Sequence, residues 1–113
     1  MRKIESEMVT AIVCKMNWCQ GNTCVIQDAG GTRTRVYLHG NLIAVIDNLT
    51  KTVRLSSCNW KTPTTKSRLN VILKTLSCKS GVRQENSKWL FIRNSYGIEQ
   101  KEQFKDNMVV SFR

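Results

Sequence analysis

The sequence contains little acidic charge, one histidine and one proline, and it has no long apolar run. Its longest uninterrupted apolar stretch, from Leu42 to Ile46, is far shorter than the roughly 20 residues that a helix needs to cross a bilayer. Glu5 and Glu7 interrupt the N-terminal segment, where a secretory signal would need roughly 7–15 apolar residues in a row. We therefore expect a soluble chain that is not exported and makes no membrane contact.

Arrangements of side chains that carry catalysis are also missing. The sequence has no constellation of paired carboxylates, no Ser-His-Asp pattern and no glycine-rich phosphate loop. Its one histidine, His39, precedes Gly40 and Asn41 in an expected turn, and no Asp or Cys accompanies it in a local motif. We expect a protein that is not an enzyme and that holds no cofactor.

The cysteines are odd in number, and we expect them to stay reduced. A chain that is not exported meets a reducing compartment, where disulfides are rare. The spacing Cys14-x4-Cys19-x4-Cys24 suggests a zinc site in which His39 would be the fourth ligand. Structural zinc sites, however, use pairs of ligands with two to four residues between them, and the sequence has no second such pair. We expect no metal, and a fold that reduced protein keeps because the thiols serve as small packing groups. The five positions are Cys14, Cys19, Cys24, Cys58 and Cys78.

The length and the apolar pattern predict one domain over residues 1–113, because 113 residues are too few for two independent cores. Apolar residues recur every three or four positions over residues 2–16 and 65–79, which predicts two helices. Thr64 or Thr65 is expected to cap the second helix at its start, and Gly81 at its end.

Between and after the helices the apolar period changes to two, which predicts strands. The connections are too short for crossovers, so the strands are expected to pair antiparallel. The order helix, strands, helix, strands predicts an α+β fold with two helices packed on one antiparallel sheet of five or six strands. The expected strands cover residues 23–28, 33–38, 42–47, 52–57, 82–84, 88–93 and a final segment near 108–112.

The charge is strongly basic and unevenly distributed. Eighteen Lys and Arg stand against eight Asp and Glu, which gives a formal net charge of +10. Between Asp47 and Glu85 the chain has eight basic residues and no acidic one. Such an excess favours a polyanionic partner, nucleic acid above all, with an acidic protein surface as the alternative. A solvated basic face without a partner is the third possibility.

The segment from Cys58 to Asn70 surrounds the start of the second expected helix with hydroxyls and cations. Free N–H groups of a first helical turn, threonine hydroxyls and flanking cations together can hold a phosphate, whereas ordinary capping leaves the cations in water. We expect loss of Lys66 and Arg68 to weaken binding and to leave folding nearly unaffected. The predicted nucleic-acid and phosphate-binding residues are Arg33, Arg35, Arg54, Trp60, Lys61, Thr64, Thr65, Lys66 and Arg68.

The stretches Val36–Ala44 and Trp60–Asn70, with the strand around Trp89 and Asp106–Val110, resemble small uncharacterised proteins of tailed bacteriophages. The resemblance covers most of the chain and carries no assigned activity and no functional residues. It implies a small viral protein made in the cytoplasm of an infected bacterial host, where it acts on host or phage machinery.

Three functions remain open from the sequence. The first is an accessory protein that binds the phosphate backbone of nucleic acid through a basic face and a helix N-terminus. The second is an inhibitor of a host or defence protein, in which the same face occupies an acidic patch or a nucleic-acid channel. The third is a sponge for a small nucleotide, whose phosphates Thr64, Thr65, Lys66 and Arg68 would hold. Charge alone does not separate the first two.

Overall fold

The computed structural model describes residues 2–112, and its helices and strands follow the predicted order. The first half of the chain forms α1 (Lys3–Val13), β1 (Trp18–Gln20), β2 (Thr23–Gln27), the 3-10 helix η1 (Ala29–Gly31), β3 (Arg33–Leu38), β4 (Asn41–Asp47) and β5 (Thr52–Leu55). The second half forms α2 (Pro63–Thr75), β6 (Ser80–Glu85), β7 (Lys88–Ser95), β8 (Ile98–Gln103) and β9 (Met108–Ser111).

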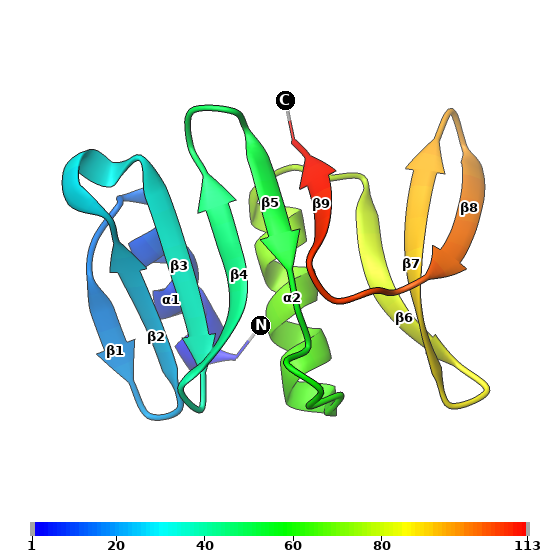
Figure 1. The fold of residues 1–113 in the computed structure, drawn as a ribbon, viewed down its shortest axis with the longest axis horizontal. Coiled ribbons are helices and arrows are strands. Elements are labelled where there is room, and N and C mark those ends of the chain that lie inside the picture. The colour runs from blue at the N-terminus through cyan, green and yellow to red at the C-terminus, as the bar shows by residue number, and fades with distance from the viewer. Residues whose placement is uncertain (1, 113) are drawn as a thin grey trace.

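The strands form two sheets rather than one (Figure 1). A six-stranded antiparallel sheet has the order β1-β2-β3-β4-β5-β9, and a three-stranded antiparallel sheet has the order β6-β7-β8. The predicted α+β class and the two helices are confirmed, whereas the single sheet is wrong. The second sheet arises because β6, β7 and β8 pair through two tight hairpins before the chain returns to place β9 beside β5. Each hairpin turn has two residues with positive φ, as right-handed strand twist requires.

Both helices cover one face of the six-stranded sheet and leave the other face open, which is the face turned toward the reader in Figure 1. Buried apolar residues recur along each helix and alternate along the central strands, and those of both helices and of the central strands meet in one apolar cluster. Val82, Trp89 and Phe91 from the second sheet belong to the same cluster, which confirms the prediction of a buried Trp89.

Both bounds of α2 differ from the predicted 65–79, because the helix begins at Pro63 and ends at Thr75. Thr62 is the N-cap, and its hydroxyl oxygen accepts a hydrogen bond from the backbone N–H of Thr65 at 3.1 Å. Pro63 occupies the first helical position, where its missing N–H costs nothing. The expected cap at Thr64 or Thr65 is therefore wrong. Gly81 is also not a cap: it lies in β6, where an added Cβ would meet the Asn70 side chain at 3.1 Å.

The prediction that all cysteines stay reduced is wrong for one pair. Cys19 and Cys24 lie directly opposite each other in the β1–β2 hairpin, with Cα atoms 4.1 Å apart, and form a disulfide. The turn between these strands sets that register, which spacing alone did not reveal. Cys14, Cys58 and Cys78 are free. No helix within residues 2–112 is long and apolar enough to cross a membrane.

Candidate nucleic-acid interface

The open face of the six-stranded sheet carries arginines because of strand alternation. In β3 the side chains of Thr34, Val36 and Leu38 enter the core, so Arg33, Arg35 and Tyr37 lie on the open face. In β5 the neighbours of Arg54, Val53 and Leu55, are both fully buried, which places Arg54 on the open face as well. The alternation predicted for both strands is confirmed.

The register of the sheet brings these arginines into neighbouring rows. Arg35 lies opposite Val45, Val45 opposite Arg54, and Arg54 opposite Val109, so one row crosses β3, β4, β5 and β9. Directly paired residues present their side chains on the same side of a sheet. The row therefore alternates cations with apolar side chains, and Arg33 stands in a neighbouring row opposite Asp47.

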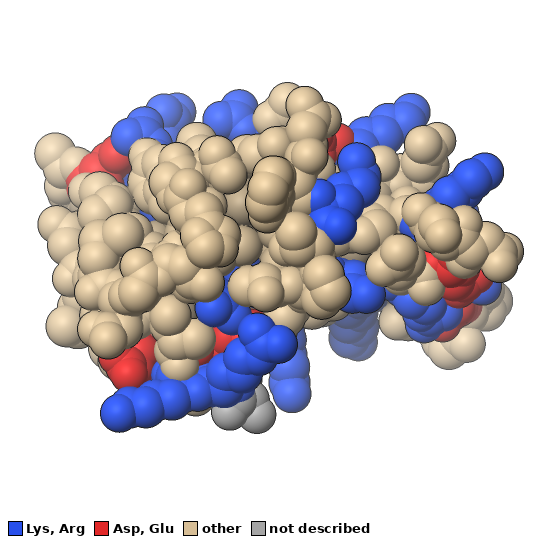
Figure 2. All heavy atoms as spheres, turned by 90° about the horizontal axis from the view of Figure 1, so that it is seen from below, with Lys and Arg blue, Asp and Glu red and all other residues tan. Residues whose placement is uncertain are grey.

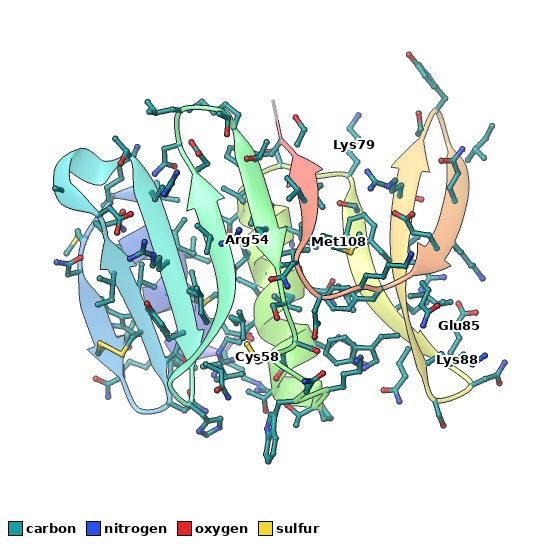
Figure 3. All side chains as sticks on the ribbon, viewed as in Figure 1. Arg54, Cys58, Lys79, Glu85, Lys88 and Met108 are labelled. Atoms are coloured by element: carbon teal, nitrogen blue, oxygen red, sulfur yellow. A yellow bond between two sulfur atoms is a disulfide. The ribbon has the colours of Figure 1, made fainter. Side chains whose placement is uncertain are left out.

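These rows line a shallow hollow of about 420 Å³, which we call the arginine groove. Figure 3 shows Arg54 near the middle of this face. Four of the nine lining residues are apolar or aromatic, and we call these four the floor of the groove; the other five are charged or polar. The lining residues are Arg33, Arg35, Tyr37, Leu42, Val45, Asp47, Thr52, Arg54 and Val109.

The charge of the arginine groove is only partly neutralised. Arg35 Nη1 lies 3.1 Å from Asp28 Oδ1, and Arg33 Nε lies 3.8 Å from Asp47 Oδ2, and both pairs are open to solvent on the arginine side, where such pairs are weak. The backbone N–H of Thr50 holds the pKa of Asp47 below its usual value. Across residues 2–112 no carboxylate forms an ion pair with Arg54. Three arginines against one lining carboxylate leave the groove positive.

A second hollow of about 340 Å³ adjoins the first and shares Val109 with it. We call it the hairpin groove, because its other residues come from β7, β8, β9 and the connection between the last two strands: Arg93, Glu102, Gln103, Lys105 and Met108. Arg93 is held by Glu102 at 3.1 Å and lies over the Phe91 ring. In the described part of the chain Lys105 has no ion-pair partner.

Arg68 and Thr65 are not accessible to a phosphate at the predicted site, because both are buried, with exposed fractions of 2% and 1%. Arg68 Nη1 donates to Glu5 Oε2 at 2.8 Å, and its Nε donates to Thr23 Oγ1 at 3.2 Å. The reason is helical spacing: α2 begins at Pro63, so Arg68 lies in its second turn on the same stripe as Leu69 and Ile72.

The other predicted residues at the start of α2 stay near the surface. Trp60 is 57% exposed, Lys61 is exposed, and Thr64 and Lys66 are half-buried. None of the four lines the arginine groove. Figure 2 looks onto the end of the molecule where α2 begins, and shows Lys and Arg side chains in several groups, with uncharged and acidic residues between the groups.

Local contacts at this end show ordinary helix capping. The Thr62 hydroxyl oxygen accepts the hydrogen bond from the Thr65 N–H, as described above. The Asp106 carboxylate accepts hydrogen bonds from both the N–H and the hydroxyl of Ser57 at 2.8 Å. Burial opposes ionisation of Asp106, but the Ser57 hydrogen bonds hold its pKa below the usual range. A nearby carboxylate disfavours an anion. The nucleotide sponge loses two of its four proposed residues, Thr65 and Arg68.

Sequence reasoning missed the hairpin groove, because its residues are assembled by contacts distant in the chain. Arg93 lies in an expected strand, and Lys105 and Met108 lie more than ten residues further along the chain. They line one hollow with Arg93 only because β9 pairs with β5, a contact that the sequence pattern does not indicate. Among residues 2–112 no three His, Cys, Asp or Glu side chains come together as metal ligands.

The family model described as Kyanoviridae Gp96 protein matches residues 1–111, which include every helix and strand of the structure. No curated protein and no solved structure matches the chain.

Proposed function

The chain belongs to the Kyanoviridae Gp96 protein family, a family of tailed cyanophages, and we propose that it is a phage accessory protein. From the arginine groove we propose that it binds the phosphate backbone of nucleic acid. The membership confirms the resemblance to proteins of tailed bacteriophages. In this proposal the protein acts in the cytoplasm of the infected bacterial host, and the arginine groove makes the contact.

The observation that carries the proposal is Arg54, which has no ion-pair partner within residues 2–112 and lines the same hollow as Arg33 and Arg35 on the open sheet face. A guanidinium donates two parallel hydrogen bonds to phosphate oxygens, which makes arginine well suited to this ligand. Arg33 and Arg35 side chains are 56% and 38% exposed, so their weak ion pairs can be exchanged for phosphate contacts. Solubility alone favours a mixed surface, and does not require three arginines around one hollow.

The proposal is tested with purified, nuclease-treated protein and labelled oligonucleotides, by fluorescence anisotropy at several salt concentrations. We expect log affinity to fall linearly with log salt, with a slope of about −0.7 to −0.9 per contacted phosphate. Arg54→Ala should weaken binding to all sequences by a similar factor and flatten that slope by about one, because a backbone contact carries no sequence code.

Lys74→Ala is the matched control, since Lys74 is exposed on α2, which covers the opposite face of the sheet. Its affinity and slope should stay near those of the unmodified protein. If folded protein binds no nucleic acid at low salt, the proposal fails, and the basic face would then be assigned to an acidic protein partner.

A further inference from the structure

We infer that the ligand is single-stranded nucleic acid, which crosses the sheet from the arginine groove into the hairpin groove. This inference rests on the proposed function and names the substrate class of the same site. It comes from two features that backbone binding alone does not need, namely the apolar floor of the arginine groove and the continuity of the two hollows.

The floor of the arginine groove matches an unpaired base better than a duplex. Leu42, Val45 and Val109 line it together with the half-buried Tyr37. A duplex keeps its bases stacked inside and offers a protein face its phosphates, for which cations suffice. A single strand exposes the faces of its bases, and these pack on aromatic and apolar side chains in a sequence-tolerant way.

The two hollows give a single strand a path. They meet at Val109, whose side chain is 56% exposed, and each has a cation without an ion pair in the described structure: Arg54 in the first and Lys105 in the second. The row from Arg35 to Val109 crosses three strand spacings, or about 14 Å. Cations spaced along a groove with apolar surface between them are the pattern that follows a single-stranded backbone.

The test compares an oligonucleotide with its duplex of equal length at one salt concentration. We expect the single strand to bind about tenfold more tightly or better, because only its bases reach the floor of the groove. If the duplex binds as tightly as the single strand, the inference is overturned and the proposed function stands. If neither binds, the proposed function itself fails.

Two pairs of variants separate base contacts from charge. Tyr37→Leu should weaken single-strand binding by about fivefold or more without changing the salt slope, whereas Tyr37→Phe keeps the ring and should keep the affinity. Val109→Glu places a carboxylate where the hollows meet and should reduce binding strongly. Val13→Glu makes the same change at a 62% exposed position of α1 and should have little effect. Equal losses in both members of a pair contradict the inference.

Discussion

Arg68→Ala is expected to lower the free energy of unfolding by about 3–5 kcal/mol, the cost of leaving one member of a buried ion pair alone. Glu5 and Arg68 are 3% and 2% exposed, and their charged atoms lie 2.8 Å apart. Ser67 donates to the same carboxylate oxygen at 2.6 Å, so removal of the guanidinium leaves Glu5 buried with too few donors. Urea unfolding followed by tryptophan fluorescence measures the loss.

Lys66→Ala provides the matched control, because Lys66 lies in the same helix at a half-buried position, and no carboxylate within residues 2–112 pairs with it. It should cost less than about 1 kcal/mol, as surface substitutions usually do. The double variant of Glu5 and Arg68 to alanine should cost less than the sum of the singles, since each single leaves a buried charge behind. A cost below about 1 kcal/mol for Arg68→Ala would restore the sequence-based expectation that this residue is dispensable for folding.

The same pair gives stability a pH dependence of defined sign. Burial opposes ionisation of Glu5, but hydrogen bonds from Ser67 and Arg68 hold its pKa below the usual value. Because the folded pKa is lower than the unfolded one, the stabilisation is present above the unfolded pKa of about 4.3 and is lost as the pH falls through the folded value. Asp106 contributes with the same sign. Stability measured from neutral to acid pH should therefore decline in the acid range.

Replacing the three groove arginines, Arg33, Arg35 and Arg54, with alanine is expected to reduce nucleic-acid affinity by about a hundredfold or more and to flatten the salt slope by about two to three. Each guanidinium that contacts a phosphate releases a counterion, so the losses in slope should add. The fold should persist, because the two ion pairs that are lost lie at the surface, open to solvent, and contribute at most about 1 kcal/mol each.

A second triple variant separates the groove from net charge. Lys66, Lys74 and Lys79 to alanine removes the same charge from α2 and the segment before β6. If binding depends on the arginine groove, this variant should keep most of the affinity at moderate salt. Equal losses in the two triple variants would show that overall charge, and not the groove, attracts the ligand.

The sequence predicted those elements whose apolar period is clear. The alternation of β3, the inward Val53 and Leu55 of β5 and the apolar stripe of α2 are confirmed. Strand β8 was missed because all of its residues are exposed, so no buried face imposes a period of two on Ile98–Gln103. Without β8, the final strands were assigned to one sheet, and the three-stranded sheet could not be predicted.

The exposure of the candidate site residues was predicted for the strands but not for the second helix. Strand alternation is local, and it correctly placed Arg33 and Arg35 outward. Burial of Arg68 depends on Glu5, its partner from α1, which lies far away in the chain and which local spacing does not reveal. A charged residue on the stripe of Leu69 and Ile72 was the available signal, since that stripe faces the core.

An amide-resolved NMR titration of the protein with a single-stranded oligonucleotide tests the location of binding most directly. We predict that the shifted amides belong to β3, β4, β5 and β9 and are centred on Arg35, Arg54 and Val109, with weaker changes around Lys105. The helices α1 and α2 should change little, because they cover the opposite face of the sheet. Shifts concentrated from Trp60 to Lys66, with the open face of the sheet unchanged, would contradict the assignment of binding to the arginine groove.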